Sequence, residues 1–416
     1  MEICTNKQFP KFTELTNPRP VSLQTVQKLL KPEEALLLQL TGETGTFVFL
    51  VRQNDVKLAH TNMNKKGLDR SVASLRKGLV AHRPPFDTAA AHYLYQNLIL
   101  PFESKLNGIR NIIAVVDGAM QTLPLSVLLV SSPAAPPESA FNFQRLDFLA
   151  LHYALSVVPS VSSFEALRSV VKPSESIEPF VGFGDPNLDA PIPGAREMPA
   201  DVVNKSVASI DLKTLRLEPL PATRDELTAL AKLLKAGENS LFFGEKATEA
   251  TVKTTDLSRY RIVAFATHGL LARESGLAEP ALVLTPSNTE TNIDDGLLTA
   301  SEIASLKLDA DWVILSACNT AGSEGRPGAE GLSGLAKAFF YAGSRALMVS
   351  HWYVESEASL QLITEAIQEF SKDPTIGRAE ALRRAMEGLM KEESKPEYAH
   401  PFFWAPFVIV GEGGKG

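Results

Sequence analysis

The sequence predicts an α/β fold with a mostly parallel sheet and helices on both faces. Three observations indicate this fold. Apolar runs of strand length alternate with amphipathic stretches of helix length in the second half of the chain. Several of these runs are rich in β-branched residues, as buried parallel strands are. The chain has 416 residues, of which 44% are hydrophobic, enough for a large core and for two or three domains.

The first half of the chain begins with a short amphipathic helix, expected over residues 22–30. Two strands then flank Gly42-Glu43-Thr44-Gly45, which is typical of a hairpin turn, and a third strand follows. Two helices, a buried strand and a strand ending in Gly-Asp-Pro come next. The expected strands cover residues 35–40, 45–51, 55–60, 112–116 and 180–184, and the expected helices cover residues 72–80 and 89–99.

The second half alternates between strands and helices. Thr223, followed by Glu226 three residues later, is typical of a capping box that starts a helix. Thr248 is expected to cap the next helix. The expected strands cover residues 240–243, 261–266, 281–284, 312–315, 346–349 and 407–410, and the expected helices cover residues 223–235, 247–254, 332–341, 360–370 and 378–391.

A proline-rich stretch separates two predicted lobes. Residues 187–204, counted with Pro186, contain four prolines. We place the boundary there, which gives an N-terminal lobe over residues 1–205 and a C-terminal lobe over residues 206–416. No tandem repeat of 20–50 residues is visible.

Composition argues against several classes of protein. The net charge is −7 and no long basic block occurs, so we expect no nucleic-acid partner. No apolar run approaches the roughly 18 residues of a membrane span. The first residues lack a secretory signal, and the two cysteines, Cys4 and Cys318, form no disulfide framework, so we expect a cytoplasmic protein. Neither metal-ligand spacing nor a phosphate-binding glycine loop is present, so we expect no metal and no cofactor.

Two predicted strands end in residues that carry chemistry. One is followed by Thr267-His268-Gly269 and the other by Cys318-Asn319. In a parallel α/β sheet the ligand site lies beyond the carboxyl ends of the strands. The separation, 318 − 268 = 50 residues, is close to the interval by which a caspase-type His precedes its Cys. A lone buried cysteine and a lone turn histidine are the simpler interpretation of each residue taken alone.

Together these residues indicate acyl-transfer chemistry. A thiol is mostly protonated at pH 7, and an imidazole can accept its proton and later pass it to a leaving amine. We therefore predict His268 as the general base and acid and Cys318 as the nucleophile. The backbone N–H groups of Gly269 and Cys318 are the predicted donors to the oxyanion.

The chain resembles the CHAT domain peptidases, caspase-like cysteine peptidases often found downstream of tetratricopeptide repeats. The resemblance extends over residues 20 to 412. Its most specific segments are Ala266-Thr267-His268-Gly269, Asp295-Gly296-Leu297-Leu298-Thr299-Ala300, Leu315-Ser316-Ala317-Cys318-Asn319-Thr320 and Gly331-Leu332. The segment His400-Pro401-Phe402-Phe403-Trp404-Ala405-Pro406-Phe407 closes the match.

This resemblance implies a caspase/separase-like fold with a His268–Cys318 dyad, preceded by a degenerate caspase-like N-terminal lobe. It also implies a protein substrate, with gasdermin-like proteins as one expected target, and a role in bacterial defence or programmed cell death. No tetratricopeptide repeat precedes residue 20, so we expect the regulatory region on a separate chain or outside this sequence.

The resemblance leaves the substrate pocket open. The family usually has an acidic residue a few positions after Trp352, and here Ser356 occupies that position. Four acidic residues could instead receive a basic residue before the scissile bond, and His351 could line the cleft, although a buried histidine at its edge is the simpler interpretation. The four acidic candidates are Asp294, Asp295, Glu355 and Glu357.

Three functions are compatible with this pattern. The first is a cysteine endopeptidase that a partner or proteolytic processing activates. The second is a catalytically silent CHAT module that binds proteins, against which the intact His268 and Cys318 argue. The third is another thiol acyl-transfer enzyme, such as an amidotransferase, but that class typically places its Cys before its His in the chain.

Overall fold

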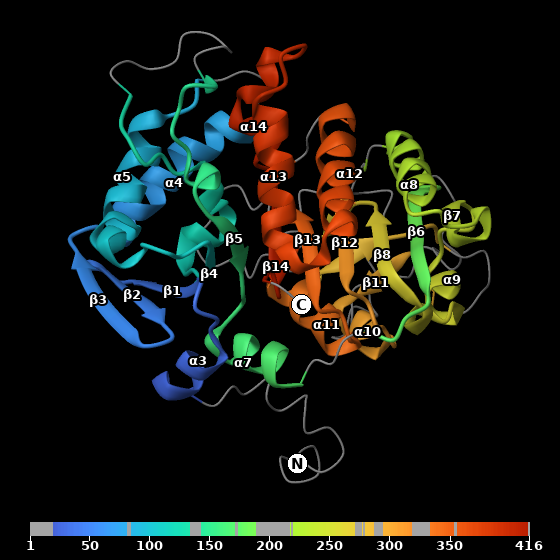
Figure 1. Ribbon diagram of the computed structural model, residues 1–416. Coiled ribbons are helices and arrows are strands. Elements are labelled where there is room, and N and C mark those ends of the chain that lie inside the picture. The colour runs from blue at the N-terminus through green and yellow to red at the C-terminus, as the bar shows by residue number, and fades with distance from the viewer. Residues whose placement is uncertain are drawn as a thin grey trace, which may run out of the picture. The chain divides into compact units, whose positions relative to one another are not determined.

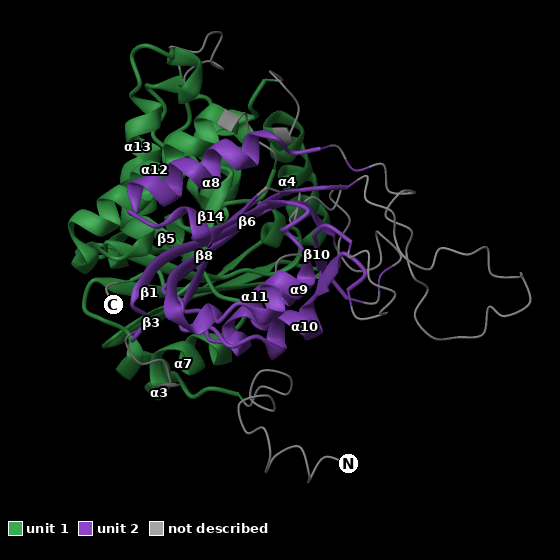
Figure 2. Cartoon of the chain, turned by 90° about the vertical axis from the view of Figure 1, so that its right-hand side faces the viewer, with its two compact units in different colours: residues 1–173, 324–328, 351–416 green, residues 174–323, 329–350 purple. Residues whose placement is uncertain are grey.

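The computed structural model describes residues 20–80, 85–133, 143–170, 174–188, 217, 219–270, 277, 279–286, 294–317, 333–352 and 356–414. These residues form two compact units, coloured separately in Figure 2. Unit 1 holds the described residues of 20–170 and 351–414, and unit 2 holds those of 174–317 and 333–350. The predicted cut between residues 205 and 206 falls outside the described residues and stays a prediction.

Unit 1 contains a sheet with the strand order β3-β2-β1-β4-β5-β14. The first three strands form the antiparallel meander expected from the Gly42–Gly45 turn, and the remaining pairs are parallel. The final strand of the chain thus pairs with a strand about 250 residues earlier. The strands are β1 (Glu34–Thr41), β2 (Thr46–Arg52), β3 (Asp55–Thr61), β4 (Asn111–Val115), β5 (Ala154–Val157) and β14 (Phe407–Gly411).

Several helices of unit 1 pack on this sheet (Figure 1). The Ser22 hydroxyl caps the first helix by accepting from the Thr25 N–H, as Ser at an N-cap position does. Helices α12 and α13 pack together, and α13 also packs on β5 and β14. The helices are α3 (Leu23–Leu29), α4 (Lys65–Val80), α5 (Thr88–Leu98), α7 (Val161–Val170), α12 (Ser356–Lys372), α13 (Arg378–Met390) and α14 (Pro401–Trp404).

Unit 2 contains five consecutive parallel strands in the order β13-β12-β8-β6-β7. They confirm the strands expected from the apolar runs. They are β6 (Glu178–Pro186), β7 (Leu241–Gly244), β8 (Tyr260–Ala266), β12 (Trp312–Ala317) and β13 (Ala346–Ser350). The expected strand at 281–284 does not join them. It is β10 (Ala281–Val283), the centre of a small antiparallel sheet with β9 (Gly269–Leu270) and β11 (Leu297–Thr299).

Helices lie on both faces of the unit 2 sheet (Figure 2). Helix α8 (Ala222–Leu233) covers one face, and α9 (Glu249–Thr254), α10 (Ala300–Ser305) and α11 (Ser333–Ala342) lie on the other. The aromatic rings of Phe183, Phe242 and Phe265 stack side by side across β6, β7 and β8 with centroids 5.1 and 5.3 Å apart. This stacked row forms part of the core of unit 2.

Helix α8 approaches β6 unusually closely because two glycines face it. A Cβ at Gly184 would lie 2.7 Å from a Leu227 methyl, and one at Gly182 would lie 3.2 Å from the other methyl. Larger side chains at either position would therefore push α8 away from the sheet.

The predicted capping box at Thr223 is wrong. Helix α8 begins one residue earlier, after Pro221, and has no side-chain cap. The Thr223 hydroxyl donates to the Leu220 carbonyl at 2.7 Å and accepts from the Asp185 N–H at 3.0 Å. Glu226 does not reach back to the helix end but is buried with only 7% of its surface exposed. Tertiary contacts with β6 thus replace the local capping pattern. By contrast, the Thr248 cap of α9 is confirmed, since its hydroxyl accepts from the Thr251 N–H.

Candidate active site

The ends of β8 and β12 meet at one edge of the unit 2 sheet. These strands are parallel neighbours, and Ala266 pairs with Ala317. His268 follows two residues after Ala266, and Cys318 follows directly after Ala317. Neighbouring strands are about 4.8 Å apart, so the two chain segments leave the sheet close together. Cys318 itself lies outside the described residues, so the distance between thiol and imidazole stays a prediction.

The segment that carries His268 is held by the small antiparallel sheet. The His268 carbonyl accepts the Val283 N–H at 2.8 Å, and the buried Thr267 hydroxyl donates to the Val283 carbonyl. Gly269 then begins β9 and pairs with Leu282. His268 is half-buried, as a residue at a sheet edge is. Its backbone is therefore positioned by β10. The oxyanion roles of Gly269 and Cys318 stay predictions.

Two strands are irregular at this edge. In β12, Leu315 pairs with Phe265 and Ala317 with Ala266, so Ser316 is an extra residue in a bulge. In β6, Asp185 occupies a similar bulge with φ of 46°. Bulges re-aim side chains and are common beside active sites.

Asp294 and Asp295 differ in their exposure. Asp294 is buried, and its carboxylate accepts the Ala250 N–H at 3.2 Å at the start of α9. Burial raises the pKa of Asp294. Asp295 is exposed, and its carboxylate accepts the Leu297 N–H at 2.9 Å. Only Asp295 of this pair therefore presents a carboxylate to solvent.

Glu249, which the sequence analysis did not single out, organises the turn that contains these aspartates. Its buried carboxylate accepts the N–H groups of Gly296 at 2.7 Å and Leu297 at 3.0 Å and pairs with Lys253 at 2.7 Å. Burial raises the pKa of Glu249 to about 7, against the opposing effect of Lys253. Gly296 has φ of 88°, which favours glycine at this turn. A local sequence pattern could not reveal a contact across 47 residues.

We expect Glu249→Ala to destabilise unit 2 by about 1–3 kcal/mol, because the buried Gly296 N–H would lose its acceptor and the Leu297 N–H would keep only Asp295. The midpoint of urea unfolding and the hydrogen exchange rates of Gly296 and Leu297 would measure this effect. Glu302→Gln is the matched control, since Glu302 binds the same Lys253 at 2.8 Å but is 32% exposed. Equal destabilisation by the two substitutions would contradict the role assigned to Glu249.

The remaining pocket candidates belong to unit 1 or are not described. His351 is buried, its Nδ1 has no hydrogen-bond partner within the described residues, and its N–H donates to the Pro406 carbonyl at 2.8 Å. Burial and, secondly, the charge of Arg76 lower the pKa of His351 to about 3. This neutral, enclosed imidazole offers no surface to a substrate. Glu357 is exposed and already pairs with Lys395, and Glu355 lies outside the described residues.

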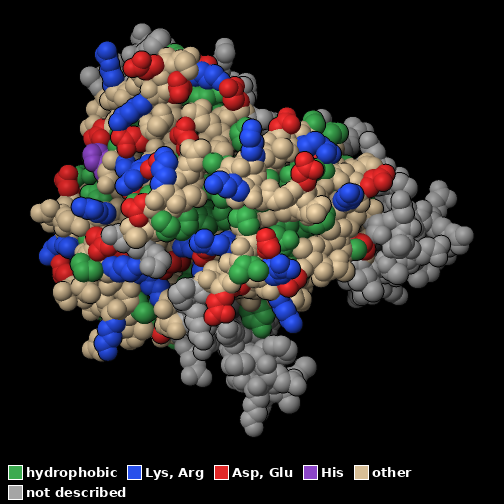
Figure 3. Space-filling model, turned by 45° about the vertical axis from the view of Figure 1, so that its right-hand side comes forward, with side chains coloured by type: hydrophobic (Ala, Val, Ile, Leu, Met, Phe, Trp, Pro, Cys, Tyr) green, Lys and Arg blue, Asp and Glu red, His purple; other side chains and the backbone are tan. Residues whose placement is uncertain are grey.

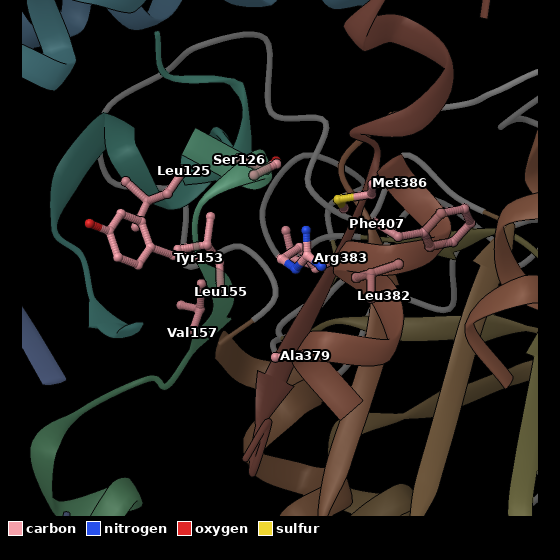
Figure 4. A pocket seen from close by; sticks show the side chains of 12 residues that line it. Leu125, Ser126, Tyr153, Leu155, Val157, Ala379, Leu382, Arg383, Met386 and Phe407 are labelled. Atoms are coloured by element: carbon pink, nitrogen blue, oxygen red, sulfur yellow. The ribbon is translucent and has the colours of Figure 1, made fainter. Parts of the chain in front are cut away.

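No group of three potential metal ligands occurs in the described part of the chain. None of its helices is long and apolar enough to cross a membrane. A small apolar pocket lies in unit 1 between α13 and strands β5 and β14 (Figure 4), and none of the predicted site residues lines it.

Two curated proteins are similar to this chain in sequence. Tetratricopeptide repeat protein 28 of Homo sapiens is 23% identical over 417 residues, and its Mus musculus counterpart is 23% identical over 436 residues. The matches cover 91% and 94% of this chain but only 15% and 16% of those proteins. The chain therefore spans about a sixth of the length of these curated relatives.

A solved structure shows the fold. Separase, in the Saccharomyces cerevisiae separase–securin complex, matches with a TM-score of 0.52 and 9% identity, over 93% of this chain and 30% of that chain. The caspase-like fold with a mostly parallel sheet flanked by helices is thereby confirmed. The sequence also matches the CHAT domain over residues 88–412. Since this match covers well over half of its length, the chain belongs to the CHAT domain family.

Proposed function

We propose that this protein is a cysteine endopeptidase that cleaves a protein substrate with a His268–Cys318 dyad. The pairing of Ala266 with Ala317 carries the proposal, because it brings the two residue-bearing segments out of adjacent strands at one edge. The separate anchoring of Thr267 and His268 on Val283 supports it. A general base whose backbone is held by a strand keeps the geometry that proton transfer requires.

The proposed reaction has two stages. His268 accepts the thiol proton while the Cys318 sulfur attacks the carbonyl carbon of the scissile peptide bond. The Gly269 and Cys318 N–H groups donate to the resulting oxyanion. The imidazolium then protonates the leaving amine as the C–N bond breaks, which leaves a thioester on Cys318. Water, deprotonated by His268, hydrolyses the thioester and restores the thiol.

We further propose that the enzyme acts in the cytoplasm on a protein such as a gasdermin-like substrate, after activation by a partner or by processing, in bacterial defence. Neither nucleic acid nor membrane is part of this proposal. Acidic and basic side chains are intermixed on the face drawn in Figure 3, which supports the absence of a nucleic-acid site there.

For specificity we propose a basic residue before the scissile bond. Asp295 supports this choice, since its carboxylate is exposed at the turn that leads into β11 of the small sheet, in which Gly269 next to His268 also pairs. Asp294 is buried, so its carboxylate is not exposed to a substrate.

The test is cleavage of a peptide library, read by mass spectrometry, with wild type and Cys318→Ala. We expect cuts by the wild type alone, with Lys or Arg before the cut, and reduced selectivity in Asp295→Asn. Equal cleavage by Cys318→Ala would contradict the dyad. If neither protein cuts the library and Cys318 reacts with iodoacetamide no faster than free cysteine, the silent protein-binding module is the correct function.

A further inference from the structure

A buried carboxyl group without a complete set of hydrogen bonds lies below the candidate site. Glu226 on α8 is 7% exposed, and its Oε1 has no hydrogen-bond partner among the described residues. Ser316 on β12 faces it, and its hydroxyl oxygen is likewise buried without a partner in the described part of the chain. Burial raises the pKa of Glu226 to about 7, and the nearby Ser316 hydroxyl opposes this rise. Buried polar groups with incomplete hydrogen bonds lower the stability of the folded state, and native proteins keep few of them without a function.

The position of Ser316 indicates which function this pair serves. Ser316 is the extra residue of the β12 bulge, between the Leu315–Phe265 and Ala317–Ala266 pairs. Cys318 follows two residues later. A bulge changes the direction in which a strand continues. Whatever holds the Ser316 side chain therefore influences where the Cys318 segment leaves the sheet.

Glu226 is held firmly enough to exert this influence. The next residue, Leu227, packs against the bare backbone of Gly182 and Gly184 on β6. Arg224 pairs with Asp185 at 2.8 Å. Helix α8 is thus anchored to β6 on both sides of Glu226, which holds the backbone of Glu226 in place relative to the sheet.

We propose that Glu226 is a positioning residue for the nucleophile: through Ser316 it sets the direction of the β12 bulge and hence the place of the Cys318 thiol. The inference rests on the proposed peptidase function. Glu226 makes no contact with substrate in this scheme. Its carboxyl group and the Ser316 hydroxyl complete their hydrogen bond when the site adopts its reactive arrangement.

The test compares four single substitutions in a Cys4→Ser background, in which Cys318 is the only thiol. Glu226→Leu and Ser316→Ala remove one side of the pair, Glu226→Gln keeps a hydrogen-bonding side chain, and Asp225→Asn is the control from the exposed face of α8. The measurements are the iodoacetamide alkylation rate of Cys318, kcat and KM for the peptide found above, and Tm.

We expect Glu226→Leu and Ser316→Ala to slow alkylation and lower kcat by about tenfold, within the effect of a 1 Å misplacement, while KM stays unchanged. Glu226→Gln should retain most activity, and Asp225→Asn should match wild type. The Tm of Glu226→Leu should not fall, because an apolar side chain replaces an incompletely bonded carboxyl group.

Two results separate the inference from the function on which it rests. A reactive wild-type Cys318 with unchanged alkylation in Glu226→Leu would overturn the positioning role alone. So would a fall in Tm that accounts for the lost activity, since that would indicate a purely structural residue. A wild-type Cys318 that is no more reactive than free cysteine would remove the peptidase function and the inference with it.

Discussion

His268→Ala should abolish measurable peptidase activity and make Cys318 behave as an ordinary thiol. General acid–base catalysis contributes about 10²- to 10⁴-fold, and His268 is assigned to both proton transfers. Without His268, the alkylation rate of Cys318 should rise with pH like that of a free cysteine, with its midpoint at about pH 8.5. In the wild type, rapid alkylation should extend to lower pH, because the imidazolium stabilises the thiolate.

The measurement is the alkylation rate of the Cys4→Ser protein between pH 5 and 10, together with kcat/KM for the library-derived peptide. His152→Ala is the control, because His152 pairs with Asp147 in unit 1 and has a partly exposed side chain. We expect it to retain wild-type activity. If His268→Ala kept its activity, or if its alkylation profile matched that of the wild type, His268 would not be the base.

Arg168→Met should lower the free energy of unfolding by about 3–5 kcal/mol, the largest loss among these substitutions. The reason is that it leaves the buried Glu34 carboxylate without its cation. The Arg168 guanidinium donates to both oxygens of Glu34, which is fully buried, and to both oxygens of Glu412. It also donates to the Leu29 carbonyl at 2.7 Å. This network joins the start of β1, helix α7 and the residue after β14. Urea unfolding of the full chain at pH 7 measures the loss.

The pH dependence has a definite sign. Burial disfavours ionised Glu34, but the hydrogen bonds and charge of Arg168 outweigh it and hold the pKa of Glu34 below its ordinary value of 4.5. The pair therefore stabilises the fold above about pH 4.5, and this contribution is lost as the pH falls further. In Arg168→Met, burial alone would raise the pKa of Glu34, so acidification would relieve its unpaired charge. The difference between variant and wild type should shrink from pH 7 to pH 4.

Arg384→Met is the matched control for this prediction. Arg384 pairs with Glu369 and Glu380 in the same unit, but its side chain is 42% exposed. Exposed ion pairs contribute at most about 1 kcal/mol, so we expect a small effect with little dependence on pH. Comparable losses in the two variants would show that the buried network has no special role.

The sequence alone predicted most of the buried strands and many of the helices. The runs at 112–116, 261–266 and 312–315 became β4, β8 and β12, because short continuous apolar runs with β-branched residues are typical of strands buried on both faces of a parallel sheet. The hairpin at Gly42–Gly45 was confirmed for the same local reason, since turn chemistry depends on a few adjacent residues. Strand β5 and helix α7 were missed, since the predictions did not include an element over 154–157 or 161–170.

Residue type and position also identified the candidate chemistry. His268 and Cys318 each follow an apolar run, and this placement requires no knowledge of how the strands are paired. The pairing of Ala266 with Ala317, by contrast, depends on how β8 and β12 align in the sheet and is seen only in the structure. The local pattern gave a wrong prediction at Thr223. Its spacing from Glu226 is typical of a capping box, but the Thr223 hydroxyl instead accepts the Asp185 N–H of β6.

The sequence by itself therefore determined the α/β class, the family and the residues of the proposed dyad, because these depend on periodicity and short motifs. Only the tertiary structure decided that β14 pairs with β5, that β10 belongs to the small antiparallel sheet, and that Glu249 and Glu226 are buried in unit 2. These features depend on contacts between residues tens to hundreds of positions apart. Burial and hydrogen bonding there are set by the packed neighbours, which no local pattern contains.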